Sequence, residues 1–340
     1  MKVLVVKTSS MGDLVHTLPA LVDASKYYPE IRFDWVSEQA FVEIPSWHPA
    51  VDKVIPIHLR GWKRHPFCRQ TRQEISRSLG QLSDLHYDQV IDAQGLVKSA
   101  IVTLLTSGTR NGMTWSSCRE GLASLAYQRK FEIAKGRHAI ERARDLFAAV
   151  LGYRYDSACL DYGLVRETFA VPGRQPAYLV FLHGTSAEKK LWQETEWVRL
   201  ADKAERHGYR VLLPWGNHSE QARAQRIASA SENIQVLPAM NLKDMAGILA
   251  AASGVVGLDS GLSHLAAALG LPAVTLYTAT SPGLTGACGS NQVCLSRLDL
   301  PNQGEPAAGH MLLKKLKTLD SGSVWSILED QMAGVGLCNR

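Results

Sequence analysis

The 340-residue sequence contains no apolar run of the roughly 18 to 20 residues that a membrane-spanning helix needs. The chain therefore offers no candidate transmembrane helix. Its first residues, MKVLVVKTSS, are typical of a strand and a polar turn rather than of a secretion signal. We therefore expect the protein to remain in the cytoplasm.

The sequence also lacks the common patterns of metal, redox and dinucleotide proteins. Its six cysteines are widely separated and form no CxxC pair, which argues against a zinc site and a disulfide framework and favours reduced thiols. No GxGxxG motif follows the first apolar strand, which argues against an NAD-dependent dehydrogenase. No DxD-like pair of carboxylates is present, so we expect no metal requirement.

A net charge of +5 is mild, but its distribution is uneven. The segment from His58 to Arg77 carries eight basic side chains against a single acid, Glu74, and Trp62 and Phe67 lie among them. Such a run is often a solvated surface. It also fits anionic lipid head groups or an acidic sugar, and it fits nucleic acid least well because the sequence contains no nucleic-acid-binding module.

The segment from Gly254 to Gly286 predicts a βαβ unit with a short crossover. The apolar run Val255–Leu258 ends at the turn Asp259-Ser260-Gly261, and a helical pattern follows until Gly270, before a second strand at Ala273–Tyr277. Free N–H groups and the helix dipole at this turn favour an anion, so we interpret it as a phosphate cradle. An ordinary capped turn is the alternative.

The start of the chain repeats this pattern. Lys2–Lys7 predicts a strand, and the turn TSSMGD leads into a helical pattern. Pro19 lies either in the first turn of a second helix, capped by Thr17, or at a kink in a single helix. Asp13 is therefore close to a helix N-terminus, where it is either a cap or a general base, and Asp92 in YDQVIDAQGLVKSA is its rival as the base.

A polar segment at residues 166–176 contains two prolines and a glycine and predicts a linker between α/β domains of similar length at 1–166 and 177–320. A strand at Tyr178–Leu182 opens the second domain. Residues 286–320 have an irregular pattern, with a helix at LLKKLKTL as one interpretation. Residues 321–340 predict a final helix that crosses back toward the first domain.

Polar and basic side chains follow the strand expected at Tyr178–Leu182. Thr185, Ser186 and Lys190 offer hydroxyls, backbone amides and a charge to nucleotide phosphates, and Lys189 is the rival for the role of Lys190. A capped turn beside a surface lysine is the alternative interpretation.

Three separated motifs, KTSSMGD, FLHGTSAEKKLW and DSGLSHLAAAL, resemble those of the heptosyltransferases of glycosyltransferase family 9, in the same order along nearly the whole chain. The branch that they resemble adds the first heptose to the inner core of lipopolysaccharide. The resemblance implies the GT-B fold, an α/β architecture of two Rossmann-like domains that face a central cleft. It also implies an inverting, metal-independent transfer of L-glycero-D-manno-heptose from ADP-heptose to a Kdo residue of Kdo-lipid A.

The resemblance also implies a role for particular residues. The catalytic residues would be Asp13, as the general base, and Lys190. The donor would contact Thr185, Ser186, Lys190, Glu220, Met240, Asp259, Ser260, Gly261, Leu262 and His264. The acceptor would contact Ser10, Gly12, Arg60, Lys63, Arg64, Gln94, Arg119 and Arg142.

The resemblance implies no cofactor and no nucleic-acid partner, and it places the protein at the cytoplasmic face of the inner membrane of a Gram-negative bacterium. We expect a monomer. One alternative is another GT-B enzyme, such as a later heptosyltransferase or a sugar-nucleotide epimerase. The other is a non-catalytic protein that binds a sugar nucleotide or lipid head groups, in which Asp13 would be dispensable.

Overall fold

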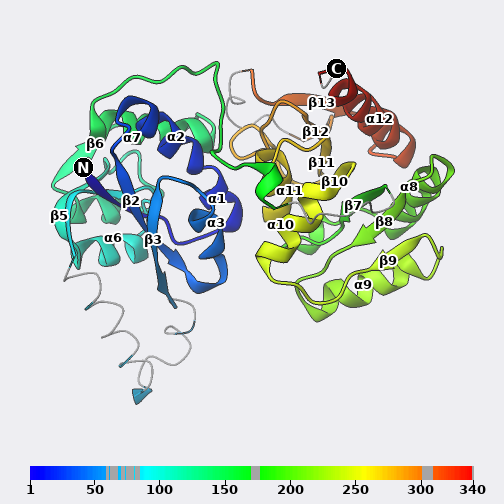
Figure 1. The fold of residues 1–340 in the computed structure, drawn as a ribbon, viewed down its shortest axis with the longest axis horizontal. Coiled ribbons are helices and arrows are strands. Elements are labelled where there is room, and N and C mark those ends of the chain that lie inside the picture. Colours follow the sequence, from blue (N-terminus) through cyan, green and yellow to red (C-terminus); the bar gives the residue numbers. More distant parts are fainter. Residues whose placement is uncertain are drawn as a thin grey trace. The chain divides into compact units, whose positions relative to one another are not determined.

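The structure is a computed structural model that describes residues 1–58, 85–169, 177–300 and 309–338, together with the single positions 61, 68, 69, 73 and 80. The chain divides into two compact units, Met1–Gly163 and Leu164–Arg340 (Figure 1). The division lies beside the linker predicted at 166–176. Within that linker, Arg166–Thr168 forms a short 3₁₀ helix, η3, and residues 170–176 lie outside the described residues.

The first unit is built around a parallel sheet in the order β3-β2-β1-β4-β5-β6. The strands are β1 (Lys2–Val6), β2 (Arg32–Glu38), β3 (Val51–Ile57), β4 (His86–Asp92), β5 (Ser107–Met113) and β6 (Arg129–Phe131). The chain moves outward in one direction from β1 to β3 and in the other from β4 to β6. The strand order therefore reverses between β1 and β4, as in a Rossmann-like fold, where ligands bind beyond the carboxyl ends of the strands at the reversal.

Helices cover both faces of this sheet, with α2 and α7 on one face and α6 on the other (Figure 1). The helical segments are α1 (Met11–Val15), α2 (Leu18–Tyr27), η1 (Gln39–Phe41), α3 (Glu43–Ser46), α6 (Val97–Leu104), η2 (Gly121–Ala126) and α7 (Ala139–Leu151). Pro19 lies in the first turn of α2, and Thr17 is the N-cap residue, so the two-helix alternative is confirmed. The Thr17 hydroxyl donates to the Asp13 carbonyl rather than capping a helix N–H group.

The strands of the first sheet are almost continuously apolar because both faces are covered. In β1, the side chains of Val3–Val6 are fully buried. Leu4 and Val6 pack with Val36 of β2 and Val90 of β4 in one core cluster. Burial of these side chains fixes the carboxyl ends of β1 and β4 next to each other.

The second unit repeats this plan with a parallel sheet in the order β13-β12-β11-β10-β7-β8-β9. Its strands are β7 (Tyr178–Leu182), β8 (Arg210–Leu213), β9 (Ile234–Val236), β10 (Gly254–Leu258), β11 (Ala273–Tyr277), β12 (Gln292–Arg297) and β13 (Leu312–Leu316). Its helical segments after η3 are η4 (Glu188–Lys190), α8 (Glu194–Arg206), α9 (His218–Ala228), α10 (Leu242–Ala251), α11 (Gly261–Ala268) and α12 (Ser321–Cys338). Here the strand order reverses between β7 and β10.

The βαβ unit predicted from Gly254 onward is confirmed, since β10, α11 and β11 follow one another and the two strands are parallel neighbours. Gly270 has a φ of 69° just after α11, the left-handed conformation that glycine adopts without strain. The chain can therefore turn sharply from the helix into β11.

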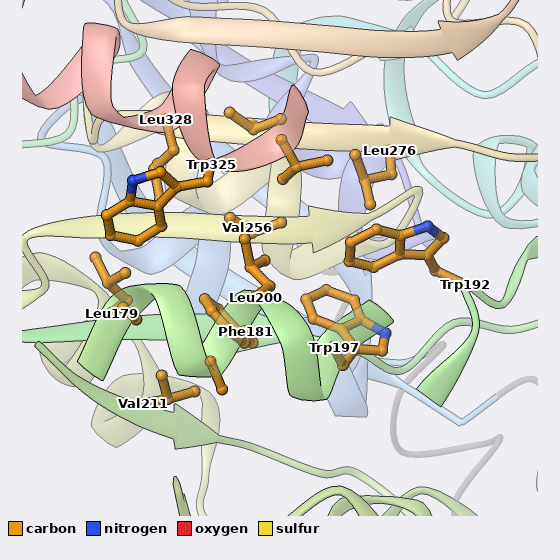
Figure 2. Close-up of a cluster of buried hydrophobic side chains, with 14 of the residues drawn as sticks. Leu179, Phe181, Trp192, Trp197, Leu200, Val211, Val256, Leu276, Trp325 and Leu328 are labelled. Atoms are coloured by element: carbon orange, nitrogen blue, oxygen red, sulfur yellow. The ribbon is translucent and has the colours of Figure 1, made fainter. Parts of the chain in front are cut away.

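Figure 2 shows the core of the second unit, in which Trp197 of α8 and Trp325 of α12 pack over the sheet. The ring of Trp192, which lies just before α8, is 5.0 Å from that of Trp197 in an edge-to-face arrangement. Trp325 of α12 joins the same cluster, and α12 contacts α8, β10 and β11 of its own unit. The prediction that this helix crosses back toward the first unit stays a prediction. Within the described ranges, no helix is long and apolar enough to cross a membrane.

The expectation for residues 286–320 is wrong. Gln292–Arg297 forms β12 beside β11, and the LLKKL part of the proposed helix forms β13 beside β12. Val293 and Leu295 are buried in the core, whereas β13 is the edge strand, with Lys314 exposed and Lys315 partly exposed. An edge strand of this composition has no strict apolar alternation, so its pairing with a distant strand decides its structure.

Candidate active site

Two polar turns meet at the reversal of the first sheet, one after β1 and one after β4. Gln94 joins them, because its Oε1 accepts hydrogen bonds from the Thr8 N–H (2.8 Å) and hydroxyl (2.7 Å), while its Nε2 donates to the Ser9 carbonyl (3.2 Å). Lys98 Nζ also donates to the Ser9 hydroxyl, at 2.9 Å. Gln94 is only 2% exposed, so it holds the two turns together. Its predicted contact with an acceptor stays a prediction.

Asp13 is the third residue of α1, and its carboxylate turns back onto the start of the helix. Its Oδ2 accepts hydrogen bonds from the N–H (2.8 Å) and the hydroxyl (3.0 Å) of Ser10, and Arg119 Nη1 lies 3.9 Å away. Burial raises the pKa of Asp13, but the Lys7 charge, the Ser10 hydrogen bonds and Arg119 outweigh this effect and hold the pKa below its usual value. Asp13 is thus a helix cap and also an ionised, partly exposed carboxylate that can accept a proton.

Asp92, the rival base, ends β4 and is fully buried. Its Oδ1 accepts from the N–H groups of Gln94 (2.9 Å) and Gly95 (3.1 Å), and its Oδ2 accepts from the Tyr127 hydroxyl (2.8 Å). Burial raises the pKa of this carboxyl despite these hydrogen bonds. Since both of its carboxylate oxygens accept hydrogen bonds inside the protein, Asp92 organises the turn after β4. The role of Asp13 as the base stays a prediction.

Lys7 is a functional candidate that the sequence analysis did not single out. Its Nζ donates to the Ala93 carbonyl at 2.9 Å and so links the two turns. Burial lowers the pKa of Lys7, while the charges of Asp13 and Asp92 raise it. A lysine placed directly after a buried strand, at an edge that also carries carboxylates, is the signal that could have identified it.

The predicted acceptor-binding residues have different surroundings. Arg119 is 57% exposed and lies beside Asp13, whereas Arg142 is partly buried and its Nη2 donates to the Ser117 carbonyl at 2.7 Å. Ser10 is exposed next to Asp13, and Gly12 is buried in α1. The remaining residues of this set, Arg60, Lys63 and Arg64, lie outside the described residues.

At the reversal of the second sheet, the turn after β7 meets the turn after β10. Lys190 Nζ lies 2.6 Å from Asp259 Oδ2, and Thr280 donates to the same oxygen at 2.8 Å. The Thr185 hydroxyl donates to the Asp259 carbonyl at 3.0 Å. Lys189 is exposed, so Lys190 is the lysine that belongs to this cluster.

The helix α11 begins directly after this cluster. Ser260 is its N-cap residue, with an extended backbone and no hydrogen bond from its side chain to the helix N–H groups. Ser260, Gly261 and Leu262 are partly exposed, Ser186 in the turn after β7 is exposed, and His264 is buried. The N–H groups of the first turn of α11, together with Lys190, are suited to an anionic group such as a phosphate.

Glu220 in the first turn of α9 lies next to the turn after β7. Its Oε2 accepts from the Gly216 N–H at 2.7 Å, and a β-carbon on Gly184 would lie 2.7 Å from its carboxyl carbon. Gly184 therefore allows the close approach of these two turns. Met240, the other predicted donor contact outside the central cluster, is partly exposed after β9 and is not a core side chain.

The two sheet edges offer complementary chemistry. The first unit presents an ionised carboxylate that can take a proton from a hydroxyl, and the second presents a cation, hydroxyls and a helix N-terminus that can hold a diphosphate. Tyr127 and Thr280, which have no predicted role in the site, donate hydrogen bonds to Asp92 and Asp259 from 35 and 21 residues away. Neither contact leaves a local signal in the sequence.

No group of three histidine, cysteine, aspartate or glutamate side chains in the described part of the chain could hold a metal ion. The expectation of metal independence stays a prediction.

Comparisons with known proteins agree with one another. The sequence model described as "Glycosyltransferase family 9 (heptosyltransferase)" matches residues 75–314. Lipopolysaccharide heptosyltransferase 1 of Salmonella typhimurium is 47% identical over 306 residues, which cover 89% of this chain and 96% of that protein.

Two solved structures match almost the whole chain. E. coli heptosyltransferase WaaC with ADP is similar with a TM-score of 0.87 and 42% identity, covering 97% of this chain and 100% of that one. The same enzyme with ADP-2-deoxy-2-fluoro heptose has a TM-score of 0.83 and 41% identity, covering 97% of this chain and 99% of that one.

Proposed function

The chain belongs to glycosyltransferase family 9, the heptosyltransferases, and from this premise we propose that it transfers L-glycero-D-manno-heptose from ADP-heptose to a Kdo residue of Kdo-lipid A. It is a glycosyltransferase of the GT-B fold that acts in lipopolysaccharide inner-core biosynthesis and uses a nucleotide-sugar donor. The identity of the acceptor, the stereochemical course and the independence from metal are part of the proposal.

The observation that carries the proposal is the contrast between the two sheet reversals. One holds Asp13, ionised and partly exposed, and the other holds Lys190 paired with Asp259 beside the start of α11. A sugar transfer from a nucleotide donor needs both functions, because the attacking hydroxyl must lose a proton while the departing diphosphate gains negative charge.

The proposed mechanism is a single displacement with inversion. Asp13 takes the proton of the acceptor hydroxyl, and the oxygen forms a bond to the anomeric carbon from the face opposite ADP. The bond from that carbon to the diphosphate oxygen breaks, and ADP leaves with the bonding electrons. Lys190, Thr185, Ser186 and the first turn of α11 stabilise the diphosphate, and this stabilisation takes the place of a magnesium ion.

Asp259, Glu220 and Met240 are proposed to bind the rest of the donor. Glu220 accepts hydrogen bonds from the ribose, Met240 contacts the base, and Asp259 organises the turn or meets the heptose. Arg119 and Arg142 provide cations for the acidic sugars and phosphates of the acceptor, to which a guanidinium can bind in two places.

The proposed setting is the cytoplasmic face of the inner membrane of a Gram-negative bacterium, where a lipid-linked acceptor is presented to a monomeric enzyme. The absence of a membrane-spanning helix from the described residues is compatible with peripheral attachment.

The test is ADP release from ADP-heptose, with Kdo-lipid A as the acceptor and EDTA present. We expect turnover to depend on the acceptor, to survive chelation, and to fall by about 10² or more in Asp13→Ala while donor binding is retained. Asp244→Ala is the matched control, because Asp244 is also the third residue of a helix, α10, but is exposed in the second unit.

A turnover that EDTA abolishes would contradict the metal-free mechanism. An Asp13→Ala variant as active as Asp244→Ala would remove Asp13 from the reaction. Tight ADP binding without turnover would point to another acceptor or to a binding role.

A further inference from the structure

The helix α6 of the first unit exposes most of its large apolar side chains. Its large apolar side chains Val97, Ile101 and Leu104 are 37%, 55% and 53% exposed. The buried side of α6 carries Ser99, Ala100, Val102 and Thr103. Of these, only Val102 joins the hydrophobic core cluster of β1, β2 and β4. A helix on the surface of a globular protein normally buries its apolar stripe, but the described residues leave most of the apolar side chains of α6 uncovered.

The neighbouring segment η2 likewise exposes its large apolar side chains. Leu122 and Leu125 are 60% and 70% exposed, whereas Ala123, Ser124 and Ala126 between and beside them are buried. Residues three apart lie above one another on a 3₁₀ helix, so the two leucines form one outward ridge.

These side chains belong to a single surface. The segments α6 and η2 contact each other, and the Val97 N–H donates to Glu120 Oε2 at 2.7 Å. Trp115 is 57% exposed and lies so close to η2 that a β-carbon on Gly121 would be 2.6 Å from its ring. We call this surface the outward apolar patch and define it as Val97, Ile101, Leu104, Leu105, Trp115, Leu122 and Leu125.

The chain segment that carries the patch is basic. Residues 97–135 contain six basic residues against two acidic ones, Glu120 and Glu132. Arg119, Arg129 and Lys130 are exposed. The six basic residues are Lys98, Arg110, Arg119, Arg129, Lys130 and Lys135. Leucine and tryptophan flanked by lysine and arginine are the composition of surfaces that insert at the boundary between lipid head groups and acyl chains.

We propose that the outward apolar patch docks the protein on an anionic lipid bilayer, with its leucines and tryptophan at the acyl boundary and exposed basic side chains of the same chain segment at the head groups. A second copy of the chain fits this surface less well, because pairing two identical patches would bring like charges together. An anionic bilayer offers both an apolar phase and the opposite charge.

The position of the patch agrees with the chemistry of the first unit. Arg119 directly precedes Glu120, which accepts a hydrogen bond from the Val97 N–H of the patch, and the Arg119 guanidinium lies 3.9 Å from Asp13. The patch therefore borders the turn that carries the proposed base. This part of the argument rests on the proposed function, in which the acceptor is lipid-linked and its sugars must reach Asp13 while its acyl chains remain in the membrane.

The test is flotation of the full chain with vesicles, without donor or acceptor. Vesicles of phosphatidylcholine alone are compared with vesicles that also contain phosphatidylglycerol. We expect binding to the anionic vesicles that weakens as salt is raised, and a loss of affinity of about tenfold or more in Leu122→Ser/Leu125→Ser. Arg129→Gln/Lys130→Gln should weaken binding to the anionic vesicles and reduce its salt dependence.

Leu298→Ser/Leu312→Ser is the matched control, because these leucines of the second unit are 57% and 52% exposed and lie outside the patch. An equal loss in the two leucine pairs, or unchanged vesicle binding in Leu122→Ser/Leu125→Ser, would overturn the proposal. So would a concentration-dependent dimer, seen by sedimentation, that disappears in Leu122→Ser/Leu125→Ser while vesicle binding persists.

A second readout separates docking from catalysis. With a deacylated, water-soluble Kdo acceptor, Leu122→Ser/Leu125→Ser should turn over at the rate of the unmodified protein, whereas with acceptor embedded in vesicles it should be slower. A loss of activity with both acceptors would contradict a docking role. Because vesicle binding is measured without substrates, it tests the patch even if the proposed reaction fails.

Discussion

Lys190 provides the sharpest test of how the second unit handles a leaving group. Its Nζ is 2.6 Å from Asp259 Oδ2, and the two side chains are only 19% and 14% exposed. Lys190→Met removes the charge but keeps most of the side-chain volume, so the turn after β7 can stay packed. The variant therefore separates the electrostatic role of Lys190 from its space-filling role.

Two free energies are expected to change. At 2.6 Å the Coulomb attraction of the ion pair is about 6 kcal/mol at an effective dielectric constant of about 20. Desolvation offsets most of this, which leaves a loss of about 1 to 3 kcal/mol in the free energy of unfolding. The transition state loses one preorganised cation at the diphosphate, which corresponds to a fall in kcat of about 10² to 10³.

The assay is ADP release under saturating acceptor, with kcat and KM for the donor measured separately and urea unfolding of the same preparation. Lys189→Ala is the control, because Lys189 is the adjacent lysine and is exposed. We expect Lys189→Ala to keep kcat within about twofold and its free energy of unfolding within about 0.5 kcal/mol.

Two results would contradict a role for Lys190 in the transition state. One is a folded Lys190→Met variant whose kcat falls less than about tenfold, and the other is a fall in kcat/KM that comes wholly from a higher KM for the donor. In the first case the cation would not act on the transition state. In the second it would contribute only uniform binding of the donor.

Two further predictions concern pH. Removing the Lys7 charge in Lys7→Met should raise the pKa of Asp13, because that charge favours the ionised carboxylate. Since the base must be ionised, the acid limb of the pH profile of kcat should move to higher pH. The control is Lys2→Met, which removes a lysine paired with Asp34 and should leave the acid limb in place. His183 is fully buried, and burial lowers its pKa to about 4. The unfolded state, in which the pKa is about 6.5, therefore binds the proton more readily than the folded state. The free energy of unfolding consequently falls as the pH is lowered from about 6.5 toward 4. This corresponds to a fall of about 2 kcal/mol in the free energy of unfolding between pH 7 and pH 5, and urea unfolding of His183→Gln should show a smaller fall over the same range; an equal fall in the variant would contradict the assignment.

The strands and turns that carry the site could be predicted because their signals are local. The apolar runs at Lys2–Lys7, Tyr178–Leu182 and Ala273–Tyr277 are buried on both faces of parallel sheets, and such strands are almost continuously apolar. Where the signal was weak, as at the edge strand β13, the prediction was wrong because pairing with β12 rather than local pattern decides the structure.

The roles of the residues in the site also depend partly on local sequence and partly on long-range contacts. The sequence places Asp13 and Asp92 after strands, and nothing in their spacing distinguishes them as bases. The distinction follows from burial and from the long-range hydrogen bond of Tyr127, which occupies Asp92, while Lys7 and Arg119 keep Asp13 ionised at a partly exposed position. Likewise, the sequence does not distinguish the adjacent lysines Lys189 and Lys190, and only the ion pair with Asp259 shows that Lys190 belongs to the polar cluster of the second unit.

The two-domain α/β plan, the family resemblance and the polar turns at which chemistry is expected can be predicted from the amino-acid sequence, because strand patterning, turn residues and motifs are properties of neighbouring residues. Only the folded protein shows which carboxylate is fully buried, which lysine meets Asp259, and which apolar side chains of α6 and η2 are exposed. Those properties depend on contacts between residues far apart in the chain and on burial, and neither is fixed until the sheets and helices have packed.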